Sequence, residues 1–395
     1  MSDLLADTNV ALGVSGSIAA VKVVELAHEL RRHGASVRAV MTGAATGIVH
    51  PWAVEFATEH DVVTEITGRV EHVELCGRDG WADVLLLAPT TANTVGKVAA
   101  AVDDTPVTTC VTTALGAGVP VVCAPAMHEP MYDHPGVLDA IDRVESWGVE
   151  FVDPRIEEGK AKIATEDAIV TGVARAAGER PLEGKRVVVT SGATSESVDT
   201  VRVLTSRASG RTGRAVARAL AARGADVTLL HDASAAGEAG DPPWADVVDV
   251  ESAAEMTDAA VEACADADAL VSAAAISDYT VEAAGEKIRS GKESLTLELT
   301  PTPKLLDTVR AEYPDLTLVG FKAESEGDED ALVERARQTL ERVNLAFVVA
   351  NDASVMGAAE TRALVVRDDS VGEVAGEKLD LGLRVADELA SDLSE

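Results

Sequence analysis

The chain has 395 residues and a formal net charge of −33, and 47% of its residues are hydrophobic. That hydrophobic share is enough for well-filled cores and excludes a chain disordered throughout, while the length suggests two or three domains. No apolar run approaches the roughly 18–20 residues of a membrane span, and the acidic N-terminus is not a secretory signal. The charge argues against a basic face that binds nucleic acid.

The charged residues follow a pattern of their own. Only 10 of the 34 basic residues are lysine, and the acidic residues are spread along the whole chain. Such a surface suits strong salt, where screening removes the repulsion between carboxylates. We expect a salt-loving organism; the alternative is an ordinary acidic protein. The four cysteines are too widely spaced for a disulfide framework or a zinc site, so reduced thiols in the cytoplasm are expected.

Buried strands alternate with helices in the first half of the chain. The strands are predicted at Asn9–Val14, Ser36–Met41, Val84–Ala88 and Val119–Cys123, and the helices near Ile18–Arg32 and Asp139–Trp147. Short, continuously apolar strands are typical of a parallel sheet that is covered on both faces. The pattern therefore predicts a three-layer α/β domain over residues 1–178.

A polar stretch punctuated by Gly178, Pro181 and Gly184 reads as a linker, and a second α/β domain is expected over residues 183–395. Its predicted strands are Arg186–Thr190, Asp226–Leu230, Asp246–Val250, Ala269–Ala273, Leu316–Phe321 and Leu345–Ala350. Its predicted helices are Thr212–Arg223, Ser252–Ala265, Ala331–Arg342 and Glu377–Leu393. Two long loops, Ala233–Trp244 and Ala284–Ser294, favour a functional role.

Three segments of the first half follow predicted strands, at the sheet edge where open α/β folds bind ligands. They are Gly13–Lys22 (GVSGSIAAVK), Ala88–Asn93 (APTTAN) and Ala124–Tyr132 (APAMHEPMY). The first lacks the glycine spacing of a dinucleotide site and the lysine of a P-loop, but its small residues and hydroxyls suit one phosphate. A tight turn with a serine cap is the structural alternative. Between strands, His72 is either a general base or a surface histidine.

Together with VEHVEL around His72, these segments stand in the order seen in flavin-dependent cysteine decarboxylases. The first half resembles the phosphopantothenoylcysteine decarboxylase half of the bifunctional coenzyme A biosynthesis proteins. The resemblance implies a flavodoxin-like domain that binds FMN, with His72 as a catalytic histidine. It also implies that the residues near the flavin and its phosphate are Ser15, Gly16, Ser17, Thr42, Thr91 and Asn93.

The first half departs from that family in two places. Many relatives have asparagine where this chain has His128, and a neutral histidine can also both donate and accept a hydrogen bond. Many relatives also carry a cysteine, the proton donor, in a flap that corresponds to Glu157–Asp167, which has no cysteine here. Lys160, Lys162 and Thr165 are the candidates to bind substrate or donate the proton.

In the second half, Ser191–Gly213 gathers Arg202, Arg207 and Arg211 beside glycines that would let a phosphate approach the backbone. A loop whose arginines pair with nearby carboxylates is the alternative. Ser272–Tyr279 offers small residues against which a ring could lie, and a carboxylate, Asp278, suited to Mg²⁺.

These segments, with EKI, GFKAE and AND further on, resemble the phosphopantothenate–cysteine ligase half of the same proteins. The resemblance implies a Rossmann-like domain that uses CTP and Mg²⁺ to form an acyl-cytidylate, which the cysteine amine then attacks. It implies Arg202, Ser206 and Lys287 as catalytic residues, and Asp278 as the metal ligand. The implied nucleotide contacts are Ala273, Ala274, Asp278, Lys287, Pro303, Lys304, Leu305, Leu306 and Phe321.

The ligase half also departs from the family. Ser206 replaces a catalytic asparagine, Arg211 replaces a lysine, and two nucleotide-facing lysines fall at Thr339 and Val343. A hydroxyl can still donate one hydrogen bond, whereas valine cannot bind phosphate. The sequence does not decide between CTP and ATP.

The sequence thus predicts a bifunctional enzyme that joins cysteine to 4′-phosphopantothenate and then decarboxylates the product to 4′-phosphopantetheine. A cytoplasmic homo-oligomer without nucleic acid or membrane partners is expected, and the acidic surface points to a halophilic archaeon. The alternative is a flavoprotein regulator that only binds. A nicotinamide dehydrogenase is disfavoured because neither first strand-to-helix turn has the GxGxxG spacing.

Overall fold

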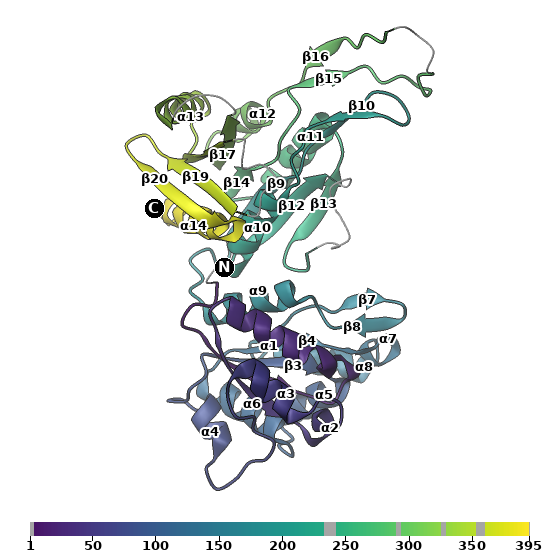
Figure 1. Cartoon of the computed structure of the whole chain (residues 1–395), viewed down its shortest axis with the longest axis vertical. Helices are drawn as coiled ribbons and strands as arrows, with labels where there is room; N and C mark the ends of the chain where they lie inside the picture. Colours follow the sequence, from purple (N-terminus) through teal and green to yellow (C-terminus); the bar gives the residue numbers. More distant parts are fainter. Residues whose placement is uncertain (1–3, 233–241, 290–293, 325–328, 353–359, 395) are drawn as a thin grey trace. The chain divides into compact units, whose positions relative to one another are not determined.

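A computed structural model describes residues 4–232, 242–289, 294–324, 329–352 and 360–394. The chain divides into two compact units, Met1–Glu179 and Arg180–Glu395, each of which is described by itself (Figure 1). Residues 233–241 of the predicted loop Ala233–Trp244 and residues 290–293 of the predicted loop Ala284–Ser294 lie outside the described residues.

Unit 1 is built on a five-stranded parallel sheet in the order β2-β1-β3-β4-β6. The strands are β1 (Asn9–Val14), β2 (Ser36–Met41), β3 (Val84–Thr90), β4 (Val121–Pro125) and β6 (Val149–Phe151). All seven residues of β3 are buried, as the continuous apolar run predicts for a central strand.

Helices cover both faces of this sheet. One group, whose members contact one another and the sheet, is α1 (Val23–Arg32), α3 (Pro51–Thr58) and α9 (Glu166–Ala177). The other is α4 (Glu71–Cys76), α5 (Ala92–Ala99), α6 (Pro106–Ala117) and α8 (Pro135–Glu145). Short elements complete the unit: η1 (Ile18–Lys22), α2 (Gly43–Thr46), α7 (Glu129–Tyr132) and a small antiparallel sheet of β5 (Met127–His128), β8 (Lys160–Lys162) and β7 (Arg155–Glu157).

Unit 2 is built on an eight-stranded sheet in the order β13-β12-β9-β14-β17-β18-β19-β20. It is parallel from β13 to β18, and β19 and β20 extend it in antiparallel fashion. Its strands are β9 (Arg186–Ser191), β12 (Asp226–Asp232), β13 (Asp246–Val250), β14 (Ala269–Ser272), β17 (Thr317–Glu324), β18 (Phe347–Asp352), β19 (Glu360–Val366) and β20 (Val371–Glu377).

Two helices that pack on each other, α10 (Arg211–Ala222) and α14 (Lys378–Asp392), cover one face of this sheet. The others are α11 (Ala253–Cys264), α12 (Leu305–Glu312) and α13 (Glu329–Val343). Two hairpins stand off the sheet (Figure 1): β10 (Ser195–Ser197) with β11 (Val203–Thr205), and β15 (Tyr279–Val281) with β16 (Leu299–Pro301).

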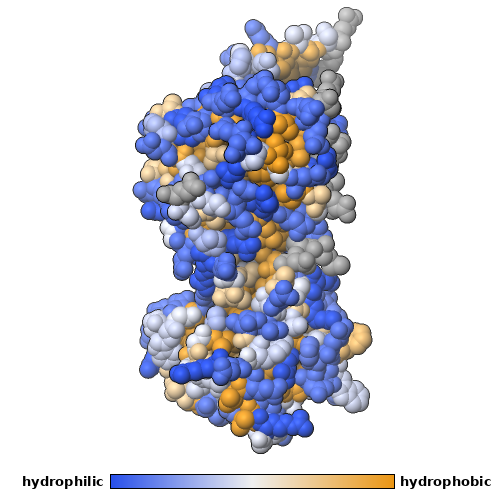
Figure 2. Space-filling view, turned by 90° about the vertical axis from the view of Figure 1, so that its left-hand side faces the viewer, coloured by the Kyte–Doolittle hydropathy of each residue, from blue (hydrophilic) through white to orange (hydrophobic). Residues whose placement is uncertain are grey.

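The predicted fold class is confirmed, because both units are α/β layers around a largely parallel sheet. Figure 2 shows hydrophilic residues over much of the face that it presents, with hydrophobic patches between them. Among the residues described, no helix has the length and apolar character needed to cross a bilayer.

Candidate functional site

In unit 1, three neighbouring strands end at one edge of the sheet in hydroxyl-bearing turns. β1 lies between β2 and β3, so the chain passes from β1 to β2 on one side and then returns across β1 to β3 on the other. Such a reversal opens a crevice at the carboxyl ends of the strands, where doubly wound folds bind ligands. Ser17 follows β1, Thr42 follows β2 and Thr91 follows β3. The structure therefore brings the predicted flavin-contacting segments to one edge.

The two serines of the first turn have different roles. The Ser15 hydroxyl is buried and donates to the carbonyl of Pro89, 2.7 Å away, which ties β1 to the end of β3. The Ser17 hydroxyl donates to Ala126 O at 3.0 Å and accepts from the N–H of Ala19. Between them, Gly16 passes so close to the next turn that a Cβ atom there would lie 2.5 Å from Ala44 Cβ. The turn thus presents backbone rather than side chain to a ligand.

Thr42 and Thr91 both cap helices. The Thr42 hydroxyl accepts from the N–H of Ala45 at 3.2 Å and begins α2. The Thr91 hydroxyl accepts from the N–H of Thr94 at 3.2 Å and begins α5, where Asn93 is exposed in the first turn. Capping leaves the other N–H groups of the turn directed at the same edge, where they attract an anion.

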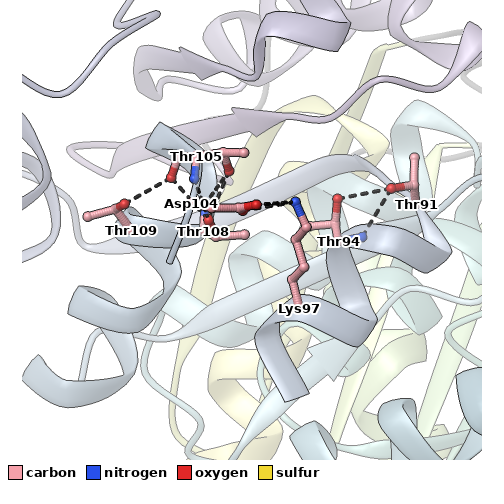
Figure 3. A network of polar contacts seen from close by, with 7 residues as sticks. All are labelled: Thr91, Thr94, Lys97, Asp104, Thr105, Thr108 and Thr109. Carbon is pink, nitrogen blue, oxygen red and sulfur yellow. Dashed lines mark hydrogen bonds and ion pairs between the residues drawn. The ribbon is translucent and has the colours of Figure 1, made fainter. Parts of the chain in front are cut away.

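Figure 3 shows the polar network that continues from Thr91. The hydroxyls of Thr91 and Thr94 are 2.9 Å apart. One turn further along α5, Lys97 Nζ lies 2.7 Å from a carboxylate oxygen of Asp104, next to the capping box that begins α6 at Thr105. The Thr91–Thr94 pair fixes the start of α5, and the Lys97–Asp104 pair ties the last turn of α5 to the residue before the cap of α6, so these contacts support the site without entering it.

A cavity of about 590 Å³ opens beside this edge. Its walls combine the first turn, Thr91, the segment after β4 and the β5-β8-β7 sheet. Its lining includes the predicted residues Gly16, Ser17, Thr91 and His128 and two of the flap candidates, Lys160 and Lys162. Apolar side chains of Ile18, Val21, Met127, Met131 and Ile163 form much of the rest.

The three flap candidates, Lys160, Lys162 and Thr165, differ in their contacts. Thr165 accepts from the N–H of Ala168 and caps α9, so its hydroxyl has a structural role. Lys162 bonds to Glu157 at 2.9 Å and Glu158 at 3.1 Å, and these hydrogen bonds raise the pKa of Lys162, which makes it a weaker acid. Within the described ranges, the Lys160 ammonium makes no hydrogen bond or ion pair. Lys160 is thus the flap cation open to a ligand.

His72 lies in the first turn of α4 and is not among the described residues that line this cavity. Its Nδ1 atom is buried and has no hydrogen-bond partner in the described part of the chain. One turn further on, Cys76 contacts Cys110 of α6, and that contact together with burial raises the pKa of the Cys110 thiol. The histidine therefore stands on a well-packed helix with one ring nitrogen unsatisfied.

In unit 2, a cavity of about 380 Å³ lies at the carboxyl ends of β9, β14, β17 and β18, between α10 and α14. Four residues predicted from the ligase segments line it: Ala273, Ala274, Asp278 and Phe321. The backbone of Gly192 and Gly210 also lines it, and Gly210 has a positive φ of 71° at the start of α10. The N-terminus of this 12-residue helix faces an anion site.

Three cations line the same cavity: Arg211, Lys322 and Lys378. Sequence reasoning missed Lys322 and Lys378 as site residues. Lys322 lies in the GFKAE segment on β17, of which only Phe321 was singled out, and Lys378 begins the last helix, where no local motif marks it. Burial lowers the pKa of Lys378, and the nearby charge of Arg211 lowers it further. Its Nζ atom lies 3.3 Å from the Thr212 hydroxyl. Two positive groups held together in this way favour the entry of a polyanion.

The positions of the missing family lysines lie elsewhere. Val343 is buried in the core and the Thr339 hydroxyl donates to Arg335 O within α13. Neither lines the cavity among the residues that the structure describes.

Asp278 forms an ion pair with Lys304, and the Thr302 N–H donates to the Asp278 carbonyl at 3.0 Å. Pro303 is exposed next to this pair. By contrast, Leu305 and Leu306 pack in or against the core below. Of the predicted turn at 303–306, only Pro303 and Lys304 therefore lie beside Asp278.

Arg202, Ser206 and Lys287 do not line the cavity among the described residues. The exposed Ser206 accepts from the N–H of Ala208 at 3.3 Å, in the segment that leads to Gly210. Arg202 lies in the turn between β10 and β11 and reaches the segment of Lys287, donating to Ile288 O at 3.1 Å. Some of the predicted ligase residues thus line the cavity, whereas Arg202 and the segment of Lys287 meet at the turn between β10 and β11.

Comparisons with known proteins cover both units. A family model described as "Flavoprotein" matches residues 2–178, and one described as "DNA/pantothenate metabolism flavoprotein C-terminal domain" matches residues 182–393. The protein named coenzyme A biosynthesis bifunctional protein CoaBC from Thermococcus kodakarensis is 46% identical over 92% of this chain and 90% of its own. The chain belongs to the coenzyme A biosynthesis bifunctional proteins.

Two further members of this family share less identity with the chain. The protein of the same name from Methanocaldococcus jannaschii is 34% identical over 98% of this chain and 94% of its own. That from Bacillus subtilis is 32% identical over 98% of each chain. The resemblance expected from both sets of motifs is confirmed, and it extends through both cavities of this bifunctional protein.

Proposed function

We propose that this bifunctional protein uses its two cavities for successive reactions of coenzyme A biosynthesis. The chain carries a decarboxylase and a ligase activity, as its family membership over both units shows. The ligase joins cysteine to 4′-phosphopantothenate, and the decarboxylase converts the product to 4′-phosphopantetheine, so the order of reactions reverses the order of the units. The observation that carries this proposal is that the match to the family spans both sheet-edge cavities. A regulator that only binds is not favoured.

The residues at the edge of unit 1 fit FMN. Backbone at Gly16, the capped turns at Ser17 and Thr91, and the exposed amide of Asn93 would hold the phosphate and ring, while Ser15 and Thr42 shape the turns. When bound, FMN supplies the electron sink that a carboxylate not β to a carbonyl lacks. The chain's own residues bind the substrate, exclude water and move protons.

His128 and Lys160 would receive the substrate in the 590 Å³ cavity. A lysine ammonium donates only, so it suits the substrate carboxylate or a carbanion that must be protonated. The imidazole of His128 can donate or accept, which suits the amide or carboxylate of the same substrate. His72 would act as an acid or base through its unsatisfied Nδ1 atom.

In unit 2, the N-terminus of α10 with Arg211, Lys322 and Lys378 would hold the triphosphate of CTP. Asp278 is the only acidic residue among those described in the lining, and one carboxylate together with phosphate oxygens is a common Mg²⁺ environment. Phosphopantothenate carboxylate attacks the α-phosphate and pyrophosphate leaves; the cysteine amine then attacks the acyl carbon and CMP leaves. We expect Ala273, Ala274 and Phe321 to hold the nucleoside.

The test is a reconstitution with the purified chain in molar salt. CTP, 4′-phosphopantothenate and cysteine should yield pyrophosphate and, with flavin bound, CO2. A yellow protein with flavin absorption is expected, and ATP in place of CTP measures nucleotide preference. A protein that binds flavin but releases neither pyrophosphate nor CO2 would contradict the proposal. A cytoplasmic homo-oligomer is part of the proposal, and light scattering in the same buffer measures its size.

A further inference from the structure

A buried carboxylate joins the β10–β11 turn to the segment that follows β15. The Asp199 side chain has no exposed surface. Its Oδ1 atom accepts from the N–H groups of Val201 at 2.8 Å and Arg202 at 2.9 Å. Its Oδ2 atom accepts from Arg202 Nη1 at 2.5 Å and from the N–H of Ile288 at 3.0 Å. One carboxylate thus satisfies four donors from two segments.

The contacts also fix Lys287. Ile288 donates its N–H to Asp199 and accepts, through its carbonyl, from Arg202 Nη1 at 3.1 Å. Both polar groups of the residue next to Lys287 are therefore held by the Asp199–Arg202 pair. The side chain of Arg202 remains 45% exposed, and Lys287 is exposed. The contacts of Asp199 and Ile288 therefore hold both charges in place, and both side chains remain accessible to solvent.

The carboxylate is held in its charged form. Burial alone would raise the pKa of Asp199, but the three backbone N–H donors and the charge of Arg202 outweigh burial and leave the pKa below its ordinary value. An ionised Asp199 keeps the guanidinium oriented through a charge-assisted hydrogen bond.

A second buried carboxylate nearby does not share these contacts. Glu196 accepts from the N–H of Ala253 at 2.9 Å and from the Thr280 hydroxyl at 2.6 Å, which fastens β10 to the start of α11 and to β15. Glu196 is therefore a matched comparison, similar in burial and position but, among the described residues, without a hydrogen bond to Arg202 or Ile288.

We propose that Asp199 is a positioning residue of the ligase, which sets Arg202 and Lys287 as one site for an anionic group of the acid substrate, a phosphate or acyl phosphate. This proposal rests on the proposed ligase function. It assigns Asp199 no contact with the substrate; Asp199 acts through Arg202 and through the backbone of Ile288. A cation misplaced by about 1 Å is enough to cost roughly 10²-fold in rate.

The test compares Asp199→Asn with Glu196→Gln in the full chain, in molar salt. Asparagine keeps an acceptor for the N–H groups of Val201 and Arg202 but loses the charge that holds the guanidinium. We expect Asp199→Asn to raise KM for 4′-phosphopantothenate and lower kcat/KM by about 10–100-fold, with KM for CTP unchanged. Glu196→Gln should leave both KM values unchanged, whatever its effect on thermal stability. KM does not depend on the fraction of folded enzyme.

The double variant Asp199→Asn/Arg202→Ala decides whether Asp199 acts through Arg202. If it does, the loss in the double variant is smaller than the product of the two single losses, and any loss beyond that of Arg202→Ala alone measures the part that acts through the Ile288 backbone. Should Asp199→Asn fail to fold, Ile288→Pro removes the Ile288 N–H, leaves the Asp199–Arg202 pair in place and should also raise KM for 4′-phosphopantothenate, because the segment of Lys287 is released. Losses that multiply in the double variant, or KM values unchanged in Asp199→Asn, overturn the proposal. A wild-type chain without ligase activity overturns the proposed function, and this proposal with it.

Discussion

His128 and Lys160 lie opposite each other in the antiparallel pair of β5 and β8, and both line the 590 Å³ cavity of unit 1. A group that can accept a proton and a group that can donate one therefore line the same cavity from neighbouring strands. Because short strands fix the two backbones, the spacing of the side chains is set by the sheet and not by loop geometry.

The first prediction concerns Lys160. Lys160→Met removes an ammonium that has no ion pair among the described residues and keeps a chain of similar length, so CO2 release should fall by about 10²-fold or more. Flavin absorption should be retained. Lys162→Met is the matched control, because Lys162 is already bonded to Glu157 and Glu158, and its loss should cost far less. Equal rates for the two variants would show that Lys160 has no special role.

The second prediction concerns His72. His72→Asn should bind flavin, retain ligase turnover and lose CO2 release by about 10²–10⁴-fold, because a positioned acid or base is removed. Absorption spectra and a CO2 assay on the same sample measure both properties. Near-normal decarboxylation would remove His72 from the mechanism.

The third prediction concerns Lys378. Lys378→Met should raise KM for CTP by about 10-fold or more, since a charged hydrogen bond to phosphate is worth about 1.5–3 kcal/mol. Lys185→Met, on a surface ion pair with Asp268, is the control and should not change KM. The pKa of Lys378 is lowered, so its charge is lost earlier as pH rises, and CTP affinity should fall with it in the wild type. An equal pH dependence in Lys378→Met would assign the effect to another group.

The fourth prediction concerns Asp278 and Lys287. Asp278→Asn should raise the Mg²⁺ concentration needed for half-maximal pyrophosphate release, because the lining loses its carboxylate. Lys287→Ala should block pyrophosphate release from CTP and phosphopantothenate with cysteine omitted. Decarboxylation should be unchanged in both. Normal pyrophosphate release by Lys287→Ala, with failure only when cysteine is added, would move Lys287 to the second half-reaction.

The fifth prediction concerns a fragment that begins at Arg180. Leu182 is fully buried and its N–H donates to Arg223 O at 3.1 Å, so this start keeps the contacts of the first turn of unit 2. The fragment should make the cysteine adduct without flavin. A folded fragment with no ligase activity would contradict the expected independence of the ligase half.

Local pattern predicted best the strands that are largely buried. β1 and β2 have the expected bounds, because apolar runs closed by turn residues leave few alternatives. β13 also has the expected bounds, although only its last residue is buried. β10, β11, β15 and β16 were missed, since each has only three residues, which is too few to show a periodic pattern. β20 was missed because Gly372 and Gly376 weaken its strand signal and its side chains are only half-buried. β19, which pairs with β20, was missed as well.

The candidate sites divide in the same way. Thr91 and Phe321 belong to motifs next to strand ends, and the structure brings both to the lining of a cavity. Lys378 reaches its site from the last helix, where no such motif marks it. Asp199 lies in the Ser191–Gly213 segment but was not singled out, because its proposed role depends on contacts with a segment far along the chain. Sequence patterns report on residues that are close along the chain, whereas the contacts of Lys378 and Asp199 are with residues that are close only in the folded structure.

The ligase cavity depends on the last helix of the chain. Lys378 and Leu381 of α14 line it, and Gly382 lies so close to α10 that a Cβ atom there would be 2.6 Å from Ala215 O. During synthesis on the ribosome, unit 1 has left the exit tunnel long before α14 is made. A nascent chain can therefore complete the cavity of unit 1 early but has no finished cavity in unit 2 until α14 is made, so termination before α14 would leave a decarboxylase without its ligase.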